Sequence, residues 1–276
     1  MFPVFAFIAV VALVPPFIRL APVLKLVDAP DGPQGRKRHD GVIPLIGGLI
    51  VFPVFIAVSV FAGYGVSAYW PLYTAIAMLL VLGAVDDKRH VRPAIKFFVQ
   101  CLAAALVVVA GEAQLYQLGD MFGLGKIGLE FMALPFSWIA VVLLINAVNL
   151  MDGLDGLAAG YGAIALGWIA FGFFSAGDSV AALHIGIVIG ALAGFLVYNM
   201  RHPLRRKACV FLGDAGSLSL GLTLAWFAID VTKEPRAALV PISVAWILAL
   251  PIFDICAQFY RRVRLGKHPF APDRGH

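Results

Sequence analysis

Long apolar runs alternate with short polar segments along the whole chain. The runs are about as long as a helix that crosses a bilayer, and none alternates strictly between apolar and polar positions as a transmembrane β-strand does. We expect the first run to stay in the protein as a transmembrane helix, because Met1-Phe2-Pro3-Val4 lacks the basic segment and cleavage site of a secretory signal. The pattern predicts an all-α polytopic membrane protein with about nine transmembrane helices, near residues 2–18, 43–62, 70–85, 94–111, 133–149, 157–175, 180–198, 211–229 and 238–259.

Composition supports this class. Hydrophobic residues make up 61% of the 276 residues and charged residues 13%, roughly half of the charged share of a soluble domain. In lipid, only helices and closed barrels satisfy every backbone group. The spacing of Cys101, Cys209 and Cys256 suits neither a metal site nor a disulfide framework, so we interpret them as packing residues. One membrane-embedded domain, 1–276, describes the chain.

Basic residues gather on one side of the predicted membrane. With the N-terminus outside, only Lys126, Lys233 and Arg236 fall in outer segments, which leaves 18 of the 21 Lys and Arg residues inside. Positive charge on cytoplasmic loops sets the orientation of such proteins. The net charge of +5 therefore reflects topology, and because the basic residues form no single stripe, we expect no nucleic-acid partner.

Five carboxylates fall at the cytoplasmic ends of different predicted spans: Asp86, Asp87, Asp152, Asp155 and Asp214. Acids beside lipid are costly unless they face water, a cation or a partner. The positive-inside pattern does not require acids at these positions, since acids contribute little to topology. Their convergence predicts a functional site on the cytoplasmic face.

The stretch 146–160 joins two apolar runs and is rich in amides and acids. Asp152 and Asp155 are three residues apart, so on a helix they share one face. Gly156 and Gly160 form a small-xxx-small pattern, which favours close helix packing over ligand contact. Gly186, Gly190 and Gly194 indicate similar packing further along the chain.

Residues 211–217 place Asp214 between glycines where the chain re-enters the membrane. Free N–H groups at the start of this helix, together with the carboxylate, would suit phosphate oxygens and a divalent cation. The alternative interpretation is a plain helix N-cap by Asp214.

Two other polar segments also have structural interpretations. Asp86 or Asp87 could form an ion pair with Lys88, Arg89 or Lys96 at a solvated helix end. The basic cluster 36–39 in the first inside loop could anchor the topology against anionic lipid, or it could clamp a diphosphate.

The whole set of residue types favours a magnesium-dependent site for a diphosphate. Mg²⁺ prefers one or two carboxylates, substrate phosphates and waters. The chain has no Cys/His cluster for zinc, no Gly-x-Ser-x-Gly elbow for acyl transfer and no phosphate-binding loop of an ATPase.

Three motifs carry a resemblance to a known family. They are Asp86-Asp87, Asn149-Leu150-Met151-Asp152-Gly153-Leu154-Asp155-Gly156 and Phe211-Leu212-Gly213-Asp214-Ala215-Gly216-Ser217. Their order and placement resemble the polyprenyl-phosphate N-acetylhexosamine-1-phosphate transferases, of the glycosyltransferase family 4 type, over about residues 28–276. These enzymes of the bacterial cytoplasmic (inner) membrane transfer a sugar 1-phosphate from a UDP-sugar to undecaprenyl phosphate and release UMP, in cell-envelope polysaccharide synthesis.

One branch of the family fits best. The cluster 36–39, Pro44, Gly47-Gly48 and the segment 269–276 are similar to the branch that uses UDP-N-acetylglucosamine or related hexosamines. The muramyl-pentapeptide branch usually has Thr where Met151 stands. The resemblance therefore implies transfer of N-acetylglucosamine 1-phosphate.

The resemblance also implies roles for individual residues. Asp214 would bind Mg²⁺, with Mn²⁺ as an alternative, and the catalytic acids would be Asp86, beside the lipid phosphate, and Asp87, supporting it. The substrate-binding residues would be Asn149, Asp152, Asp155, Asn199, Arg38, His39 and His276. We favour direct attack by the polyprenyl phosphate with Asp86 as base or orienting group, and a covalent aspartyl-phosphate route stays open.

The C-terminus departs from the family pattern. Family members typically continue past the segment 269–276 with further histidines and at least one more span, so we expect the chain to be truncated there. The truncation leaves open a catalytically impaired family member that binds lipid or a partner protein. A separate alternative is a cation-coupled transporter, in which the acids at the membrane edge would carry the cation. The sequence leaves open whether the protein forms a homodimer.

Overall fold

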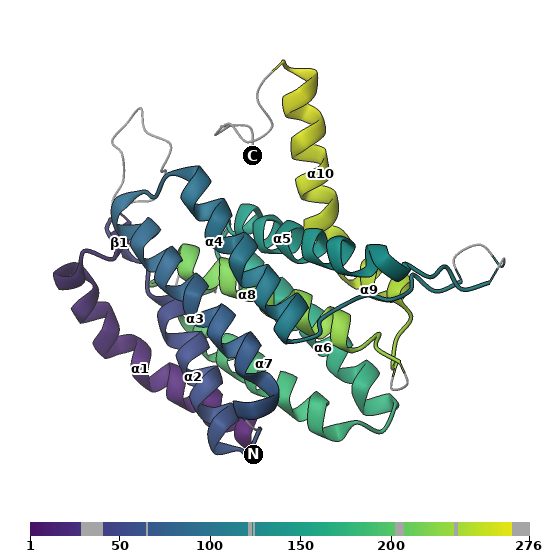
Figure 1. The fold of residues 1–276 in the computed structure, drawn as a ribbon. Coiled ribbons are helices and arrows are strands. Elements are labelled where there is room, and N and C mark those ends of the chain that lie inside the picture. The colour runs from purple at the N-terminus through teal and green to yellow at the C-terminus, as the bar shows by residue number, and fades with distance from the viewer. Residues whose placement is uncertain are drawn as a thin grey trace.

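The computed structural model describes residues 1–28, 41–64, 66–120, 123, 125–201, 207–234 and 237–266, and over these it is nearly all helical (Figure 1). The elements are α1 (Phe2–Leu24), β1 (Val27–Asp28), β2 (Ile43–Pro44), α2 (Gly47–Phe61), α3 (Val66–Arg89), α4 (Pro93–Ala105), the π-helix η1 (Leu106–Ala110), the 3₁₀-helix η2 (Glu130–Met132), α5 (Ala133–Met151), α6 (Leu157–Ser175), α7 (Ser179–Asn199), α8 (Gly213–Asp230), α9 (Pro241–Ile247) and α10 (Ala249–Arg264). The antiparallel pair β1–β2 was not predicted.

Within the described residues, six helical segments are long and apolar enough to cross a membrane. They are α1, α3, α4 with η1, η2 with α5, α6 and α7. The pair α9 and α10, bent by 71°, would make a seventh if it is one span. Every predicted segment contains a helix, and the class of an integral membrane protein is supported, but the count of about nine spans is not confirmed.

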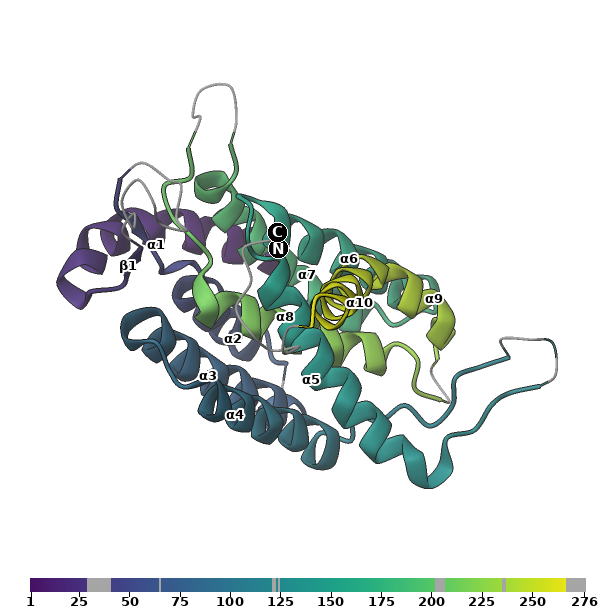
Figure 2. The ribbon, with the colours of Figure 1, turned by 90° about the horizontal axis from the view of Figure 1, so that it is seen from above.

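Helix α8 lies in the middle of the bundle, where it packs against α2, α3, α5 and α6 (Figure 2). Its side chains from Ala215 to Ile229 are buried. The hydroxyls of Ser217, Ser219 and Thr223 each donate to the carbonyl four residues earlier, at 2.7–3.1 Å. Ser137 of α5 makes the same kind of bond at 2.6 Å. Such internal bonds let a helix with polar side chains lie in an apolar interior.

Glycines bring the neighbouring helices against the start of α8. A Cβ at Gly48 of α2 would overlap the backbone of Gly216, and a Cβ at Gly83 of α3 would overlap the backbone of Ala215. Only a hydrogen in place of a side chain allows these approaches. The backbone of α8 near Asp214 is thereby fixed between two other helices.

Gly83→Ala is expected to lower the free energy of unfolding by about 1–3 kcal/mol, because the added methyl meets backbone and not a flexible side chain. Thermal unfolding of the purified protein in detergent measures the loss. Gly167→Ala on α6 is the matched control, since no atom lies within 4 Å of its added Cβ. Equal unfolding temperatures for the two variants would contradict the close approach of α3 and α8.

The glycines of α7 pack as predicted. Gly190 and Gly194 face the carbonyls of Pro3 and Phe7 on α1. The packing prediction is wrong for Gly160, because no atom lies within 4 Å of a Cβ built on it. Gly156 lies in a left-handed turn with φ +79°, where an added Cβ would lie 3.3 Å from the Met200 side chain.

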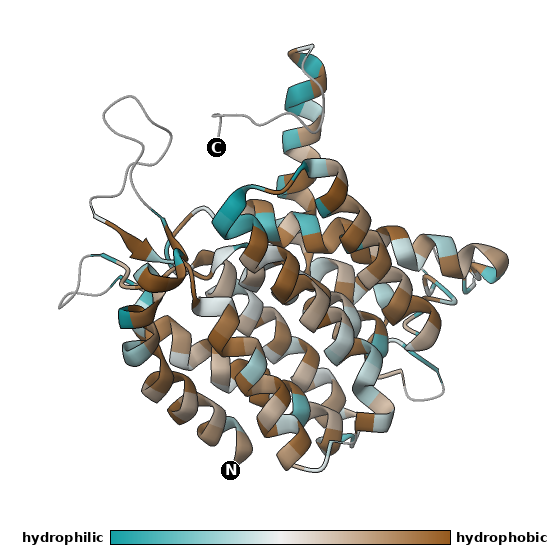
Figure 3. Cartoon of the chain, turned by 60° about the vertical axis from the view of Figure 1, so that its left-hand side comes forward, coloured by the Kyte–Doolittle hydropathy of each residue, from teal (hydrophilic) through white to brown (hydrophobic). Residues whose placement is uncertain are grey.

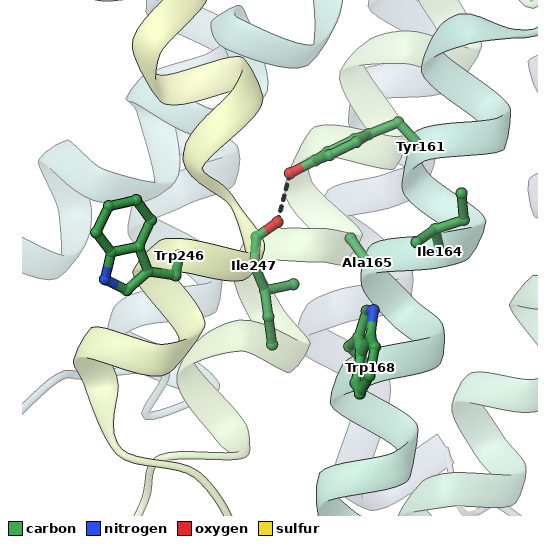
Figure 4. Close-up of a pocket in the computed structure, with 6 residues that line it drawn as sticks. All are labelled: Tyr161, Ile164, Ala165, Trp168, Trp246 and Ile247. Carbon is green, nitrogen blue, oxygen red and sulfur yellow. Dashed lines mark hydrogen bonds between the residues drawn. The ribbon is translucent and has the colours of Figure 1, made fainter.

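Hydrophobic residues cover the body of the bundle, and hydrophilic ones gather at one end and along α10 (Figure 3). Between α6 and α9 lies a groove of about 360 Å³, lined by Tyr161, Ile164, Ala165, Trp168, Trp246 and Ile247 (Figure 4). At the break between α9 and α10, Tyr161 donates its hydroxyl to the Ile247 carbonyl at 2.6 Å. This bond satisfies a carbonyl that the break would otherwise leave unpaired. None of the candidate site residues that the structure describes lines the groove.

Candidate active site

The first turn of α8 is capped by an acid from another helix. Gly213 has φ +75°, and a helix start leaves N–H groups without partners in the helix. The Asp87 carboxylate accepts from the Asp214 N–H at 3.0 Å and, at a longer 3.5 Å, from the Ala215 N–H. These N–H groups are therefore not free for phosphate, which corrects the prediction for this segment. The alternative interpretation, an N-cap by Asp214, does not hold either, because Leu212 is the N-cap and Asp214 lies in the first turn of the helix.

Lys96 joins two of the predicted acids. Its Nζ lies 2.8 Å from Asp86 Oδ2 and 2.6 Å from Asp214 Oδ2. The second oxygen of Asp86 accepts from the Val91 N–H at 2.7 Å. The ion-pair interpretation of Asp86 is thus confirmed, yet the same lysine also reaches the proposed metal ligand. Our sequence interpretation considered Lys96 only as an ion-pair partner, although a lysine in the first turn of an apolar helix is itself a signal for function.

Asn149 holds the other side of the Asp214 carboxylate. Its Nδ2 donates to Asp214 Oδ1 at 2.8 Å and to Ser217 Oγ at 2.8 Å. Asp214 is therefore fixed between an ammonium group on one oxygen and an amide on the other. The three helices α4, α5 and α8 each supply one of these side chains.

Asp152, directly after α5, lies beside this cluster and is half-buried. Burial raises the pKa of its carboxyl to about 7, and the charges of Asp214, Asp87 and Asp155 act in the same direction. At neutral pH a carboxyl with such a raised pKa is available in both the protonated and the ionised form. A bound cation would draw it toward the ionised form.

Asn199 and Asp155 connect the loops around the cluster. Asn199 Oδ1 accepts from the Gly156 N–H at 2.7 Å, and its Nδ2 donates to the Val210 carbonyl at 2.8 Å. Asp155 Oδ2 lies 2.6 Å from Arg201 Nε. Both side chains tie the turn after α5 to the segment between α7 and α8, and their predicted contact with substrate stays a prediction.

Three predicted substrate-binding residues, Arg38, His39 and His276, lie outside the described residues. Where the structure is described, no three His, Cys, Asp or Glu side chains form a ready-made metal cage. Mg²⁺ needs fewer ligands, because it keeps waters and binds substrate phosphates. Asp86 and Asp214 face one common ammonium group and keep unused lone pairs, so their oxygens suit a hard divalent cation.

Fold and site together define an apolar helical protein that fixes carboxylates, an amide and a lysine at the ends of four helices. Residues 69–232 match the family model described as glycosyl transferase family 4. The undecaprenyl-phosphate alpha-N-acetylglucosaminyl 1-phosphate transferase of Escherichia coli (strain K12) is 35% identical over 268 residues, which cover 92% of this chain and 69% of that protein.

Two further relatives have similar names. The protein of the same name from Yersinia pestis is 34% identical over 247 residues, which cover 89% of this chain and 67% of that protein. The probable undecaprenyl-phosphate N-acetylglucosaminyl 1-phosphate transferase of Bacillus subtilis (strain 168) is 33% identical over 93% of this chain and 72% of its own. The chain belongs to glycosyl transferase family 4, as the resemblance predicted, and it is a multi-pass bacterial membrane protein.

Proposed function

We propose that this protein transfers N-acetylglucosamine 1-phosphate from its UDP-sugar to undecaprenyl phosphate and releases UMP, for cell-envelope polysaccharide synthesis. The names of the relatives support the lipid acceptor and the sugar. The observation that carries the proposal is the Lys96 ammonium between Asp86 and Asp214, because phosphoryl transfer depends mainly on positioning and charge stabilisation. The site faces the cytoplasm, with the N-terminus outside, in agreement with the distribution of basic residues.

The reaction forms one phosphorus–oxygen bond and breaks another. An oxygen of the polyprenyl phosphate attacks the phosphorus that bears the sugar, and the bond from that phosphorus to the UMP oxygen breaks. Asp86 orients the attacking phosphate and accepts its proton if it carries one, while Lys96 balances the developing negative charge. Asp87 holds the first turn of α8, and Asn149 holds Asp214. Asp214, with Asp86, would hold Mg²⁺ or Mn²⁺, which neutralises the diphosphate when bound.

UMP release from the purified protein tests the proposal. Undecaprenyl phosphate and a panel of UDP-sugars are supplied with and without Mg²⁺, and we expect turnover with UDP-N-acetylglucosamine or a close relative only when the metal and the lipid are both present. No UMP from any donor would contradict the proposal. A burst of UMP without lipid would instead favour the covalent aspartyl-phosphate route.

A further inference from the structure

A second polar layer lies between α4 and α5, deeper in the bundle than the site. Asn146 Nδ2 donates to Gln100 Oε1 at 2.9 Å and also to the Val142 carbonyl at 2.8 Å. The Gln100 side chain is 1% exposed, so the bond is shielded from water. Nothing in the proposed reaction uses either amide.

The spacing ties this layer to the site. Gln100 follows Lys96 by four residues on α4, and Asn146 precedes Asn149 by three on α5. Side chains three or four residues apart lie on the same helix face, about one turn or 5.4 Å apart. Two successive cross-links therefore join α4 and α5. One is the Gln100–Asn146 bond, and the other runs through the Asp214 carboxylate, which Lys96 and Asn149 both bind.

Few buried side chains of α4 fix its position against α5, although the helix also packs against α3 and leads into the buried turn η1. Over Pro93–Ala105 its buried residues are Gln100, Ala103 and Ala104. Between helices in lipid there is no hydrophobic driving force, and two alanine methyls fit a neighbouring helix at several offsets. A hydrogen bond, in contrast, is made at one distance and direction. The other bond between α4 and α5 that the structure gives is from Trp138 Nε1 to the Cys101 carbonyl, at 3.0 Å.

We propose that Gln100 and Asn146 are a positioning pair for the reaction. Their bond fixes the register of α4 against α5, and this register keeps Lys96 on Oδ2 and Asn149 on Oδ1 of the same Asp214 carboxylate. The pair acts through Lys96 and Asn149 and touches no reacting atom.

Chemical labelling of Lys96 tests the register without any assumption about the reaction. Gln100→Met keeps the length of the side chain and removes the acceptor, and Asn146→Leu removes the donor. Acylation of Lys96 by an amine-reactive reagent, quantified by mass spectrometry, is expected to rise several-fold in each variant. Lys126, whose side chain is 65% exposed, is the internal reference and should not change, whereas general unfolding would also raise the labelling of Lys233, whose side chain is 26% exposed.

Trp138→Phe is the matched control, because it removes the other α4–α5 bond at a position further from Lys96. It should leave Lys96 labelling near the wild-type level. Unchanged Lys96 labelling in Gln100→Met and Asn146→Leu would overturn the proposal, and so would an equal rise in Trp138→Phe.

A kinetic arm rests on the proposed function. In Gln100→Met, kcat for UMP release should fall about tenfold while KM for the UDP-sugar stays within about twofold, as when an interaction acts in the transition state. In the double variant Gln100→Met with Asn146→Leu, kcat should fall no further than in either single variant, because both substitutions remove the same bond. If the wild type releases no UMP, the proposed function fails and the labelling result still decides the register. Multiplying losses in the double variant would overturn the pairing.

Discussion

UMP release by Asp214→Asn is expected to fall at least about 10³-fold, equivalent to about 4 kcal/mol of transition-state stabilisation. Asn has nearly the shape of Asp but no charge. Lys96 then keeps only Asp86 as an anionic partner, and the amide of Asn149 loses a carboxylate acceptor. A divalent cation would lose its leading ligand at the same time.

Two measurements separate these effects. Steady-state UMP release reports the activity, and Mn²⁺ titration followed by electron paramagnetic resonance reports the metal affinity, which should fall in parallel. Asp120→Asn is the matched control: it makes the same exchange at an exposed position between η1 and η2 and should retain wild-type values. UMP release by Asp214→Asn at a comparable rate would remove Asp214 from the proposed metal site.

The helices could be predicted from the apolar runs, but their surroundings could not. Helix α8 carries an apolar run like the others, yet it lies inside the bundle. The sequence could not show this, because protein-facing and lipid-facing positions are equally apolar. The break at Leu248 within the predicted span 238–259 has no change of polarity to mark it. Tyr161, whose hydroxyl donates to the Ile247 carbonyl at this break, is 86 residues away in the chain.

The acids of the site could be predicted because carboxylates are conspicuous in an apolar chain. Their partners were harder to find. Lys96 reaches Asp214 across 118 residues, and Asp87 caps a helix 127 residues further on. Sequence spacing carries no signal for such contacts, since they depend on how α3, α4 and α8 pack. Asn146 belongs to the polar stretch 146–160, but its partner Gln100 was overlooked for the same reason.

Lys96→Met is expected to weaken the fold and to make its stability depend on a divalent cation. The substitution leaves the Asp86 and Asp214 carboxylates facing each other without the ammonium that now lies within 2.8 Å of both. Loss of one partner from a buried ion pair costs about 3–5 kcal/mol. We expect the lower end of that range, since the Asp214 side chain is still 31% exposed. Transfer activity should fall as well, because Lys96 balances charge in the proposed reaction.

Mg²⁺ should restore part of this stability, because a ligand that binds only the folded state shifts unfolding by mass action. Thermal unfolding is measured in EDTA and again in millimolar Mg²⁺, and the rise should be larger for Lys96→Met than for the wild type. Lys88→Met replaces an exposed lysine in the last turn of α3. This variant controls for the loss of a positive charge and should unfold like the wild type in both buffers. If Lys96→Met unfolded at the wild-type temperature in EDTA, the ammonium could not be what holds the two carboxylates together, and the charge balance of the proposed site would need another source.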